Sequence, residues 1–492
     1  MNRWIIAAVL FCAANLPTQL RAGGVLEPGS SARSERVDAI LKDQMKRRGI
    51  PGLQAAVIDH GSVVFLKSYG VADIRTGTAV TDKTLFPVNS ATKAFTGVAA
   101  MQLVEQGRLD LGAPVSSYLE GLPQSWRAVT IGQLMTHMSG LPDIIDRNGA
   151  TLEGGDEARA WATVYTLPLQ FKPGEHFSYN QTNYALLQRV VSKLTGSAFQ
   201  EWVAKTQFAP SGMASTSFGD SSSRRADTAV SYHLVFPGHD GKGDLEAVYE
   251  AYPPFMRSGA GINTSARELA QWLSRVQAGR FFKDKATLAQ MWTPAAFKNG
   301  EPGPRTPGWI VKRSGEHRAI GAEGGGRAAF AVYPEDDLAV ILLSNLAGAN
   351  PEELLDQIAA NYIPDFKLAG LDSLRVALER RGFGNARAVY DDLLARDTQF
   401  GVAEAALNRW AYRLLLSGKG HEALEVFKLV VSLHPDSGNA YDSLAGGYEA
   451  LGDKANAIAN YRASLKLDAT NTNAIDRLRA LGADVSAGTT AR

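Results

Sequence analysis

The sequence predicts two folded regions, one that mixes strands with helices and one that is all helical. From about residue 30 to residue 360, short β-type runs alternate with Gly/Pro turns and isolated helices. From about residue 372 onward the chain is rich in Ala and Leu, has helical periodicity and carries almost no strand signal. At 492 residues the chain is also too long for one ordinary core, which supports a multidomain organisation.

The composition excludes several classes of function. The chain carries 51 Lys and Arg against 50 Asp and Glu, so no basic field favours nucleic acid, and we expect no nucleic-acid partner. Hydrophobic residues make up 45% of the chain, which is typical of globular proteins. The single cysteine, Cys12, can form neither an intrachain disulfide nor a thiolate metal site. No H-E-x-x-H pattern occurs among the 8 histidines, so we expect no metal site.

Residues 1–22 have the pattern of a cleavable signal peptide. Arg3 precedes an apolar run over residues 4–16, and a polar stretch follows that ends at Ala22. The apolar run is shorter than the roughly 20 residues that a transmembrane helix needs. We therefore expect cleavage near Ala22, a periplasmic or secreted mature protein, and no stable membrane span.

A strand–turn–strand unit opens the mixed region, and a buried helix follows it. Residues 53–58 and 63–67 are β-type runs, and Asp59-His60-Gly61 between them favours a tight turn. Apolar residues then recur at helical spacing from about residue 90 until Gly107, which ends the helix.

Ser90 lies in the first turn of this helix, and Lys93 follows three residues later. Residues at i and i+3 share a helix face, so the amine is expected beside the hydroxyl. A lysine whose pKa is lowered by burial can activate a serine nucleophile, and the helix N-terminus offers N–H groups to a developing oxyanion. Taken alone, the S-x-x-K pattern fits a capping serine and a solvated lysine better.

Landmarks on both sides of Ser90 change that balance. They are Pro51-Gly52 before a strand, Thr84-Leu85-Phe86, the stretch LVEQGRL at 103–109 and the stretch LMTHMSGL at 134–141. As an ordered set they resemble the serine β-lactamase-like hydrolase family, which includes class C β-lactamases, D-Ala-D-Ala carboxypeptidases, D-aminopeptidases and related carboxylesterases. The resemblance implies an α+β fold of the β-lactamase/penicillin-binding-protein type. That fold has an antiparallel sheet flanked by helices, a helical subdomain, and a site in the cleft between them. His137, within the last landmark, is expected to be a structural hydrogen-bonding residue.

The second motif of this family, Tyr-x-Asn, matches Tyr179-Asn180-Gln181. The resemblance implies that Tyr179 assists proton transfer near the nucleophile; the alternative is a packed aromatic residue. Gln181 replaces the usual asparagine, and its longer side chain could contact a substrate amide or Lys93. A different register, which uses Asn180 or Asn183 as the amide, stays open.

The third motif, usually Lys-Thr-Gly or His-x-Gly on the sheet's edge strand, matches Glu323-Gly324-Gly325-Gly326. The resemblance implies that the N–H of Gly326, with that of Ser90, holds the oxyanion. Gly325 suits a backbone that approaches a ligand closely. Glu323 stands where a basic residue is usual, and its carboxylate would repel an anionic substrate. It could also pair with Lys93 or Arg327, or be a solvated charge at the end of the strand.

The helical region repeats with a period of 34 residues. The matching pairs are Leu414 and Tyr448, Gly418 and Gly452, Ala423 and Ala457, Phe427 and Tyr461, and Leu433 and Leu467. The period resembles the tetratricopeptide repeat, a helix–turn–helix unit; a plain helical hairpin tail is the alternative. We therefore predict a signal peptide over 1–22, a hydrolase domain over 23–361, a linker over 362–372 and a helical repeat domain over 373–492.

Together these features predict an exported serine hydrolase that forms an acyl-enzyme on Ser90, with Lys93 as base and Tyr179 sharing the proton, and that needs no cofactor. Glu323 favours neutral or amine-bearing esters, amides or peptides over β-lactams as substrates. The alternative is a catalytically weak penicillin-binding-like protein that acts as a scaffold. A protein or peptide partner could bind the concave face of the repeats.

Overall fold

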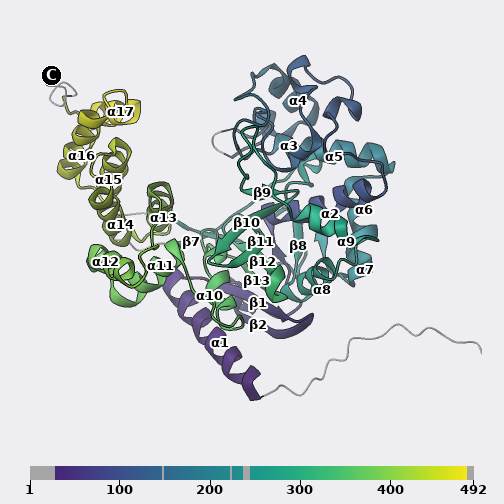
Figure 1. Cartoon of the computed structure of the whole chain (residues 1–492), viewed down its shortest axis with the longest axis horizontal. Helices are drawn as coiled ribbons and strands as arrows, with labels where there is room; N and C mark the ends of the chain where they lie inside the picture. Colours follow the sequence, from purple (N-terminus) through teal and green to yellow (C-terminus); the bar gives the residue numbers. More distant parts are fainter. Residues whose placement is uncertain (1–27, 147–148, 222–223, 236–243, 485–492) are drawn as a thin grey trace, which may run out of the picture.

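The computed structural model describes residues 28–146, 149–221, 224–235 and 244–484. The predicted signal peptide and its cleavage site lie outside these residues. Figure 1 shows a body in which a sheet lies between helices, and an arm of helices beside it. Within the described ranges, no helix is both long and apolar enough to cross a membrane.

An eight-stranded antiparallel sheet forms the centre of the body, in the order β3-β2-β1-β13-β12-β11-β10-β9. Its strands are β1 (Gly52–Asp59), β2 (Ser62–Asp73), β3 (Thr78–Ala79), β9 (Arg305–Thr306), β10 (Trp309–Ser314), β11 (His317–Gly324), β12 (Ala328–Tyr333) and β13 (Leu338–Ser344). The turn between β1 and β2 uses the positive φ angles of His60 (48°) and Gly61 (72°). The predicted strand–turn–strand unit is confirmed, although β2 continues six residues past the predicted end.

The central strands β12 and β13 are buried along their whole length, so both faces of the sheet are covered. Because side chains alternate along a strand, β13 contributes side chains to two apolar clusters, one on each face of the sheet. Ile341 and Leu343 join the cluster that contains α2 and α8, while Val340 and Leu342 join the one that contains α1 and α10. The helices are α1 (Pro28–Arg48), α2 (Thr92–Glu105), α8 (Ala266–Gln277), α9 (Lys285–Met291) and α10 (Leu355–Ala359).

Five further helices lie on the α2 side of the sheet; Figure 1 shows α3, α4 and α5 at the top, α6 beside α2 and α7 near α8. They are α3 (Ile131–Met135), α4 (Glu157–Thr166), α5 (Thr182–Thr195), α6 (Phe199–Val203) and α7 (Ala209–Ser211). Two small sheets complete the body: β4 (Phe86–Pro87), β8 (Ile262–Thr264) and β5 (Ser217–Phe218), and the hairpin of β6 (Tyr232–Val235) and β7 (Asp244–Ala247). The predicted α+β fold followed by an all-α region is confirmed.

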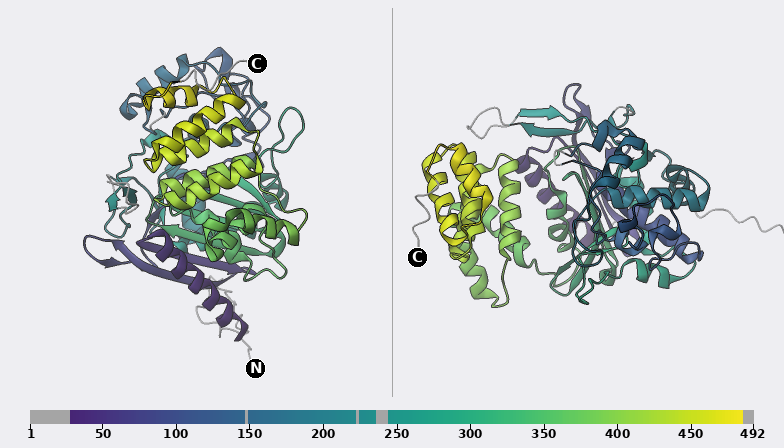
Figure 2. Two further views of the ribbon diagram at one scale, coloured as in Figure 1. Left: turned by 90° about the vertical axis from the view of Figure 1, so that its left-hand side faces the viewer. Right: turned by 90° about the horizontal axis from the view of Figure 1, so that it is seen from above.

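The arm consists of antiparallel helices whose bounds repeat. They are α11 (Gly370–Arg381), α12 (Ala386–Arg396), α13 (Glu404–Leu416), α14 (Gly420–Leu433), α15 (Gly438–Ala450), α16 (Lys454–Leu467) and α17 (Thr472–Ala480). The bounds of α13 and α14 recur 34 residues later in α15 and α16. Figure 2 shows the helices of the arm stacked side by side. Ala423 and Phe427 of the repeat pattern are fully buried between helices. The identification as a tetratricopeptide-like repeat stays a prediction.

The predicted linker contributes to the body. Tyr362 and Ile363 are buried in the same apolar cluster as Val37 and Ile358, and α11 already begins at Gly370. The domain limits themselves stay a prediction.

Candidate active site

Ser90 lies in a single 3₁₀ turn, Asn89–Ala91, that continues directly into α2. Asn89 has a φ of 47°, in the left-handed region that asparagine tolerates better than most residues. α2 is buried along most of its length, and Lys93 is only 2% exposed. Its Nζ lies 3.3 Å from Ser90 Oγ. The i, i+3 spacing thus places the amine beside the hydroxyl.

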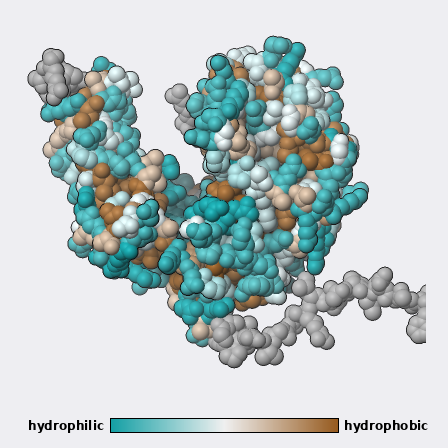
Figure 3. All heavy atoms as spheres, viewed as in Figure 1, coloured by the Kyte–Doolittle hydropathy of each residue, from teal (hydrophilic) through white to brown (hydrophobic). Residues whose placement is uncertain are grey.

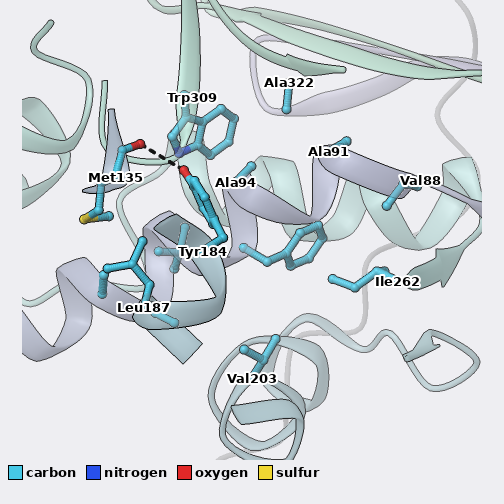
Figure 4. Close-up of a cluster of buried hydrophobic side chains, with 14 of the residues drawn as sticks. Val88, Ala91, Ala94, Met135, Tyr184, Leu187, Val203, Ile262, Trp309 and Ala322 are labelled. Carbon is cyan, nitrogen blue, oxygen red and sulfur yellow. Dashed lines mark hydrogen bonds between the residues drawn. The ribbon is translucent and has the colours of Figure 1, made fainter. Parts of the chain in front are cut away.

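Dense aromatic packing holds α2 in place (Figure 4). The ring of Phe95 stacks on that of Trp272, with centroids 3.8 Å apart. From α5, Tyr184 lies against the first turns of the helix, and its hydroxyl donates to the Met135 carbonyl at 3.0 Å. A well-packed helix keeps the nucleophile in one position, which catalysis requires.

Tyr179 closes the other side of Ser90, and its hydroxyl donates to Ser90 Oγ at 2.8 Å. Its ring packs on that of His137, with centroids 4.4 Å apart. Burial, with the positive charges of Lys93 and Arg305, holds the pKa of His137 well below its ordinary value. His137 Nδ1 faces the N–H of Asn180 at 3.3 Å, so the neutral ring accepts there and holds the Tyr179 loop. This is the structural role that the sequence predicts.

Gln181 is the amide of the second motif that reaches the reactive lysine. Lys93 Nζ donates to Gln181 Oε1 and to the carbonyl of Gly259, each at 2.9 Å. Asn180 instead donates to the Leu141 carbonyl, and Asn183 contacts His137, so neither takes this place. The register that uses Gln181 is therefore the one that the structure adopts.

Gly259 is a residue of the site that sequence reasoning missed. A Cβ at this position would lie 2.9 Å from Gln181 Oε1 and 3.4 Å from Lys93 Nζ. Only glycine therefore leaves room for the contact between Lys93 and Gln181. The surrounding sequence carries no motif that could have indicated this.

Burial is the main factor that brings Lys93 toward its neutral form. Burial, assisted by the nearby Arg305, lowers the pKa of Lys93 against the opposing effect of Tyr179. Burial opposes ionisation of Tyr179, yet the charge on Lys93 and the contacts with Lys93 and Ser90 bring its net pKa below the ordinary value. Lys93 and Tyr179 therefore each influence the ionisation of the other, beside the hydroxyl of Ser90.

The β11 strand runs past the nucleophile at Gly324. A Cβ on Gly324 would lie 2.0 Å from the Val88 carbonyl oxygen and 2.7 Å from the Ser90 nitrogen, so no other residue fits. The chain then turns through Gly325 and Gly326, whose φ angles are 59° and 60°. All three glycines line the same cavity as Ser90, and Gly324 is the one in contact with it.

β11 is not the edge strand of the sheet, because β10 and β9 pair beyond it. The pairing of β10 with β11 ends at Gly321, however, so residues 322–324 have a strand neighbour on one side only. This free side lets the end of β11 line the cavity of Ser90.

The position assigned to Glu323 needs a correction. Glu323 pairs with Ala329, whose side chain lies on the sheet face of α1 and α10. Ala322 belongs to the cluster on the α2 face and points toward the helix in Figure 4. Side chains alternate along a strand, so residues 322 and 324 share the sheet face of Ser90. The side chain on that face is therefore that of Ala322, and not that of Glu323. Glu323 lines the same cavity from the rim, where it is exposed.

Glu323 also pairs with neither Lys93 nor Arg327. Arg327 is 1% exposed and pairs with Glu250 at 2.5 Å. Asn89, directly before the nucleophile, donates to the same carboxylate at 3.1 Å. Glu250 thus ties the turn that precedes Ser90 to the start of β12.

The cavity wall also contains polar residues that lie outside the sequence motifs, namely Arg305, Asn350 and Glu352. The guanidinium of Arg305 lies over the ring of Tyr179, 5.6 Å from its centroid. Asn350 and Glu352 come from the loop after β13. In the described part of the chain, no group of three or more His, Cys, Asp or Glu side chains is placed to hold a metal ion.

Comparison with known proteins agrees with this geometry. A family model described as "Beta-lactamase" matches residues 37–362. The chain belongs to the beta-lactamase family. The family match ends before α11, so it includes the body and leaves out the arm.

Two curated relatives and one solved structure illustrate the likeness. Protein flp from Staphylococcus aureus (strain MRSA252) is 25% identical over 341 residues, 67% of this chain and 66% of flp. The chain thus spans just under two thirds of the length of that relative. Esterase EstB from Burkholderia gladioli is 29% identical over 316 residues, 57% of this chain and 79% of EstB. The octameric penicillin-binding protein homologue from Pyrococcus abyssi has a TM-score of 0.58 at 23% identity, and the match covers 70% of this chain and 81% of that one.

Proposed function

We propose that the protein is a serine hydrolase that forms an acyl-enzyme on Ser90. The observation that carries this proposal is the pair of contacts on Ser90 Oγ, 2.8 Å to the hydroxyl of Tyr179 and 3.3 Å to the amine of a buried Lys93. A nucleophile and a base within hydrogen-bond reach, with the base held by further groups, is the arrangement that covalent catalysis needs.

The proposed reaction begins when Ser90 Oγ attacks the substrate carbonyl carbon while its proton passes to the neutral amine of Lys93. The negative charge on the carbonyl oxygen is held by the N–H of Ser90 and by an N–H of the glycine turn, Gly325 or Gly326. The proton then passes, with Tyr179 as the neighbouring acid, to the leaving group as the carbon–leaving-group bond breaks. Water then attacks the acyl carbon and gives a proton to neutral Lys93. The bond between the acyl carbon and Ser90 Oγ breaks, the carboxylic acid leaves, and the proton returns to Ser90 Oγ.

We propose neutral or amine-bearing esters and amides as the substrate class. The small apolar Ala322 on the face of Ser90 and the carboxylates of Glu323 and Glu352 on the cavity wall support this class. The 29% identity to a protein named an esterase, EstB, is also in favour.

Labelling with a fluorophosphonate probe tests the reaction type. We expect the wild type to be labelled and Ser90→Ala to remain unlabelled. A folded wild type that resists the probe would instead support the binding or scaffold role. Turnover of a neutral p-nitrophenyl ester against a chromogenic cephalosporin then tests the substrate class, and faster turnover of the cephalosporin would overturn it.

We also propose that the protein is exported after cleavage near Ala22 and is periplasmic or secreted. The signal-peptide pattern of residues 1–22 supports this location. Expression of the full chain followed by fractionation and N-terminal sequencing tests it. An uncleaved chain that stays inside the cell would contradict it.

A further inference from the structure

One of the contacts between the arm and the body involves a buried carboxylate, that of Glu353, which is 7% exposed. Arg48 of α1 lies 3.2 Å from it, Arg375 of α11 lies 3.8 Å away, and Arg413 of α13 lies 3.0 Å away. The guanidinium of Arg413 and the carboxylate of Glu353 form an ion pair, but their geometry is not that of a hydrogen bond. A buried charge is tolerated only when it is paired, so all three arginines matter for this carboxylate. Two of the three belong to the arm.

Glu353 belongs to a short loop, residues 348–353, that is held on several sides. Arg48 Nη1 also donates to the carbonyls of Ala349 and Asn350, at 2.7 Å and 3.2 Å. Arg375 donates to the carbonyl of Glu353. At the end of α13, Ser417 Oγ lies 3.5 Å from the carbonyl of Gly348. The position of the loop therefore depends on both the body and the arm.

The same loop is the support of the glycine turn beside the nucleophile. The N–H of Asn350 donates to the carbonyl of Gly326 at 2.9 Å. A Cβ on Gly326 would lie 3.0 Å from Asn350 Oδ1 and 3.1 Å from the Gly348 nitrogen, so the turn and the loop are in close contact. Gly324, two residues earlier, lies against Ser90. Contacts thus connect α13 to the nucleophile through the loop and the turn.

Figure 3 shows the arm standing apart from the body along most of its length, with a hollow between them. A loosely attached arm would be expected to meet the body at an exposed, polar surface. Here the buried contacts lie against the wall of the cavity of Ser90, since Asn350 and Glu352 line that cavity. Arg413 also lies 3.9 Å from Glu352.

We propose that Arg413 is a positioning residue for the hydrolysis reaction, which acts from the arm through Glu353 and Asn350 on the turn at Gly325–Gly326. This inference rests on the proposed function. The arm holds the glycine turn where its N–H groups meet the negative charge of the transition state. Because that charge is absent from the bound substrate, loss of the contact lowers kcat more than it changes KM.

The test uses the full-length protein with the variants Arg413→Gln and Arg413→Lys. Arg409→Gln is the matched control, since Arg409 is an exposed arginine on the same helix without an ion pair in the described structure. The measurements are kcat and KM for a neutral p-nitrophenyl ester, the inhibition constant of a boronic acid transition-state analogue, and Tm. We expect Arg413→Gln to lose roughly ten-fold in kcat and in affinity for the boronic acid, at a KM within two-fold of wild type.

The conservative variant Arg413→Lys keeps the charge and is expected to recover part of the lost kcat, while the control keeps wild-type values. A wild-type kcat in a folded Arg413→Gln would overturn the inference. An equal loss of kcat in Arg413→Gln, Arg413→Lys and the control Arg409→Gln would also overturn it. If Arg413→Gln does not fold, Arg413→Lys carries the test, and an unchanged kcat there would overturn it. Failure of the wild type to hydrolyse the ester would count against the proposed function itself, which keeps the two outcomes distinct.

Discussion

The side-chain oxygen of Gln181 accepts a hydrogen bond from the amine of Lys93 at 2.9 Å, across 88 residues of sequence. The backbone N–H of Gln181 is itself fixed by the carboxylate of Asp143 at 2.9 Å. The amide is therefore held at its base, and its length decides whether it reaches the lysine.

Shortening this amide with Gln181→Asn should weaken the site, although asparagine is the residue expected from the motif. The backbone is fixed, so an amide one methylene shorter no longer reaches Lys93. We expect roughly ten-fold lower kcat on a p-nitrophenyl ester, a loss of the order of one hydrogen bond to a charged group. A Gln181→Asn enzyme as active as wild type would show that the contact is dispensable.

Arg305 should set the pH at which the enzyme becomes active. Burial is the main reason that the pKa of Lys93 is lowered, and the charge of Arg305 lowers it further, while Tyr179 and Asp143 act in the opposite direction. Because neutral Lys93 is the base, activity rises with pH through this pKa. In Arg305→Gln the pKa of Lys93 moves up, so the rising limb of kcat/KM against pH moves to higher pH.

The control for this profile is Arg313→Gln, which removes an exposed arginine from the neighbouring strand β10. It should leave the limb unchanged. At pH 7, Arg305→Gln should retain several-fold less activity than the control. A shift toward lower pH would contradict the assignment of Lys93 as the base.

The variant Gly324→Ala should separate β11 from the nucleophile. The added Cβ would meet the Val88 carbonyl and the Ser90 nitrogen, which are backbone atoms and cannot move aside cheaply. We expect a loss of roughly 100-fold in kcat/KM, since displacements of about 1 Å have such effects. Gly384→Ala, at an exposed glycine with open space around it, serves as the control and should keep full activity.

Glu352 should make the protein less stable at alkaline pH than at acid pH. Burial, with the nearby negative charges of Glu323 and Glu353, raises the pKa of Glu352 to about 7. An acid whose pKa is raised on folding holds its proton more tightly in the folded state, so stability falls as pH rises from about 4.5 to about 7. Glu352→Gln removes this loss and should be more stable than wild type at pH 8 by about 1–3 kcal/mol.

Urea unfolding at two pH values checks this expectation. The increase in the free energy of unfolding that Glu352→Gln causes should be absent near pH 4 and complete near pH 8. Glu316→Gln, which alters an exposed glutamate without an ion pair in the described structure, should show no such dependence. A Glu352 variant that is less stable at pH 8 would indicate that the ionised carboxylate is stabilising in the folded protein.

The sequence predicts the position of two residues well where both belong to the same helix or repeat. Ser90 and Lys93 are neighbours because a helix brings i and i+3 together, and the helices of the arm follow the 34-residue period. Gly259 and Arg305 could not be predicted, because tertiary packing alone brings them to Lys93 from 166 and 212 residues away. No short sequence pattern indicates contacts between residues so far apart in the chain.

The correction at Glu323 has a different cause. Three consecutive glycines follow it, and glycine carries no side chain whose polarity could mark a face of the strand. A shift of one residue reverses which side chains face the nucleophile. Only the pairing of β11 with β12 settles that Ala322 faces α2.

The three acceptors around Lys93 have a consequence for the proton itself. A neutral amine has two N–H groups, which the oxygens of Gln181 and Gly259 take at 2.9 Å each, so its lone pair is left for Ser90. Once the proton has crossed, the third N–H finds Ser90 Oγ already in place at 3.3 Å. Neither form of the lysine requires its neighbours to rearrange, and proton transfer therefore carries little reorganisation energy.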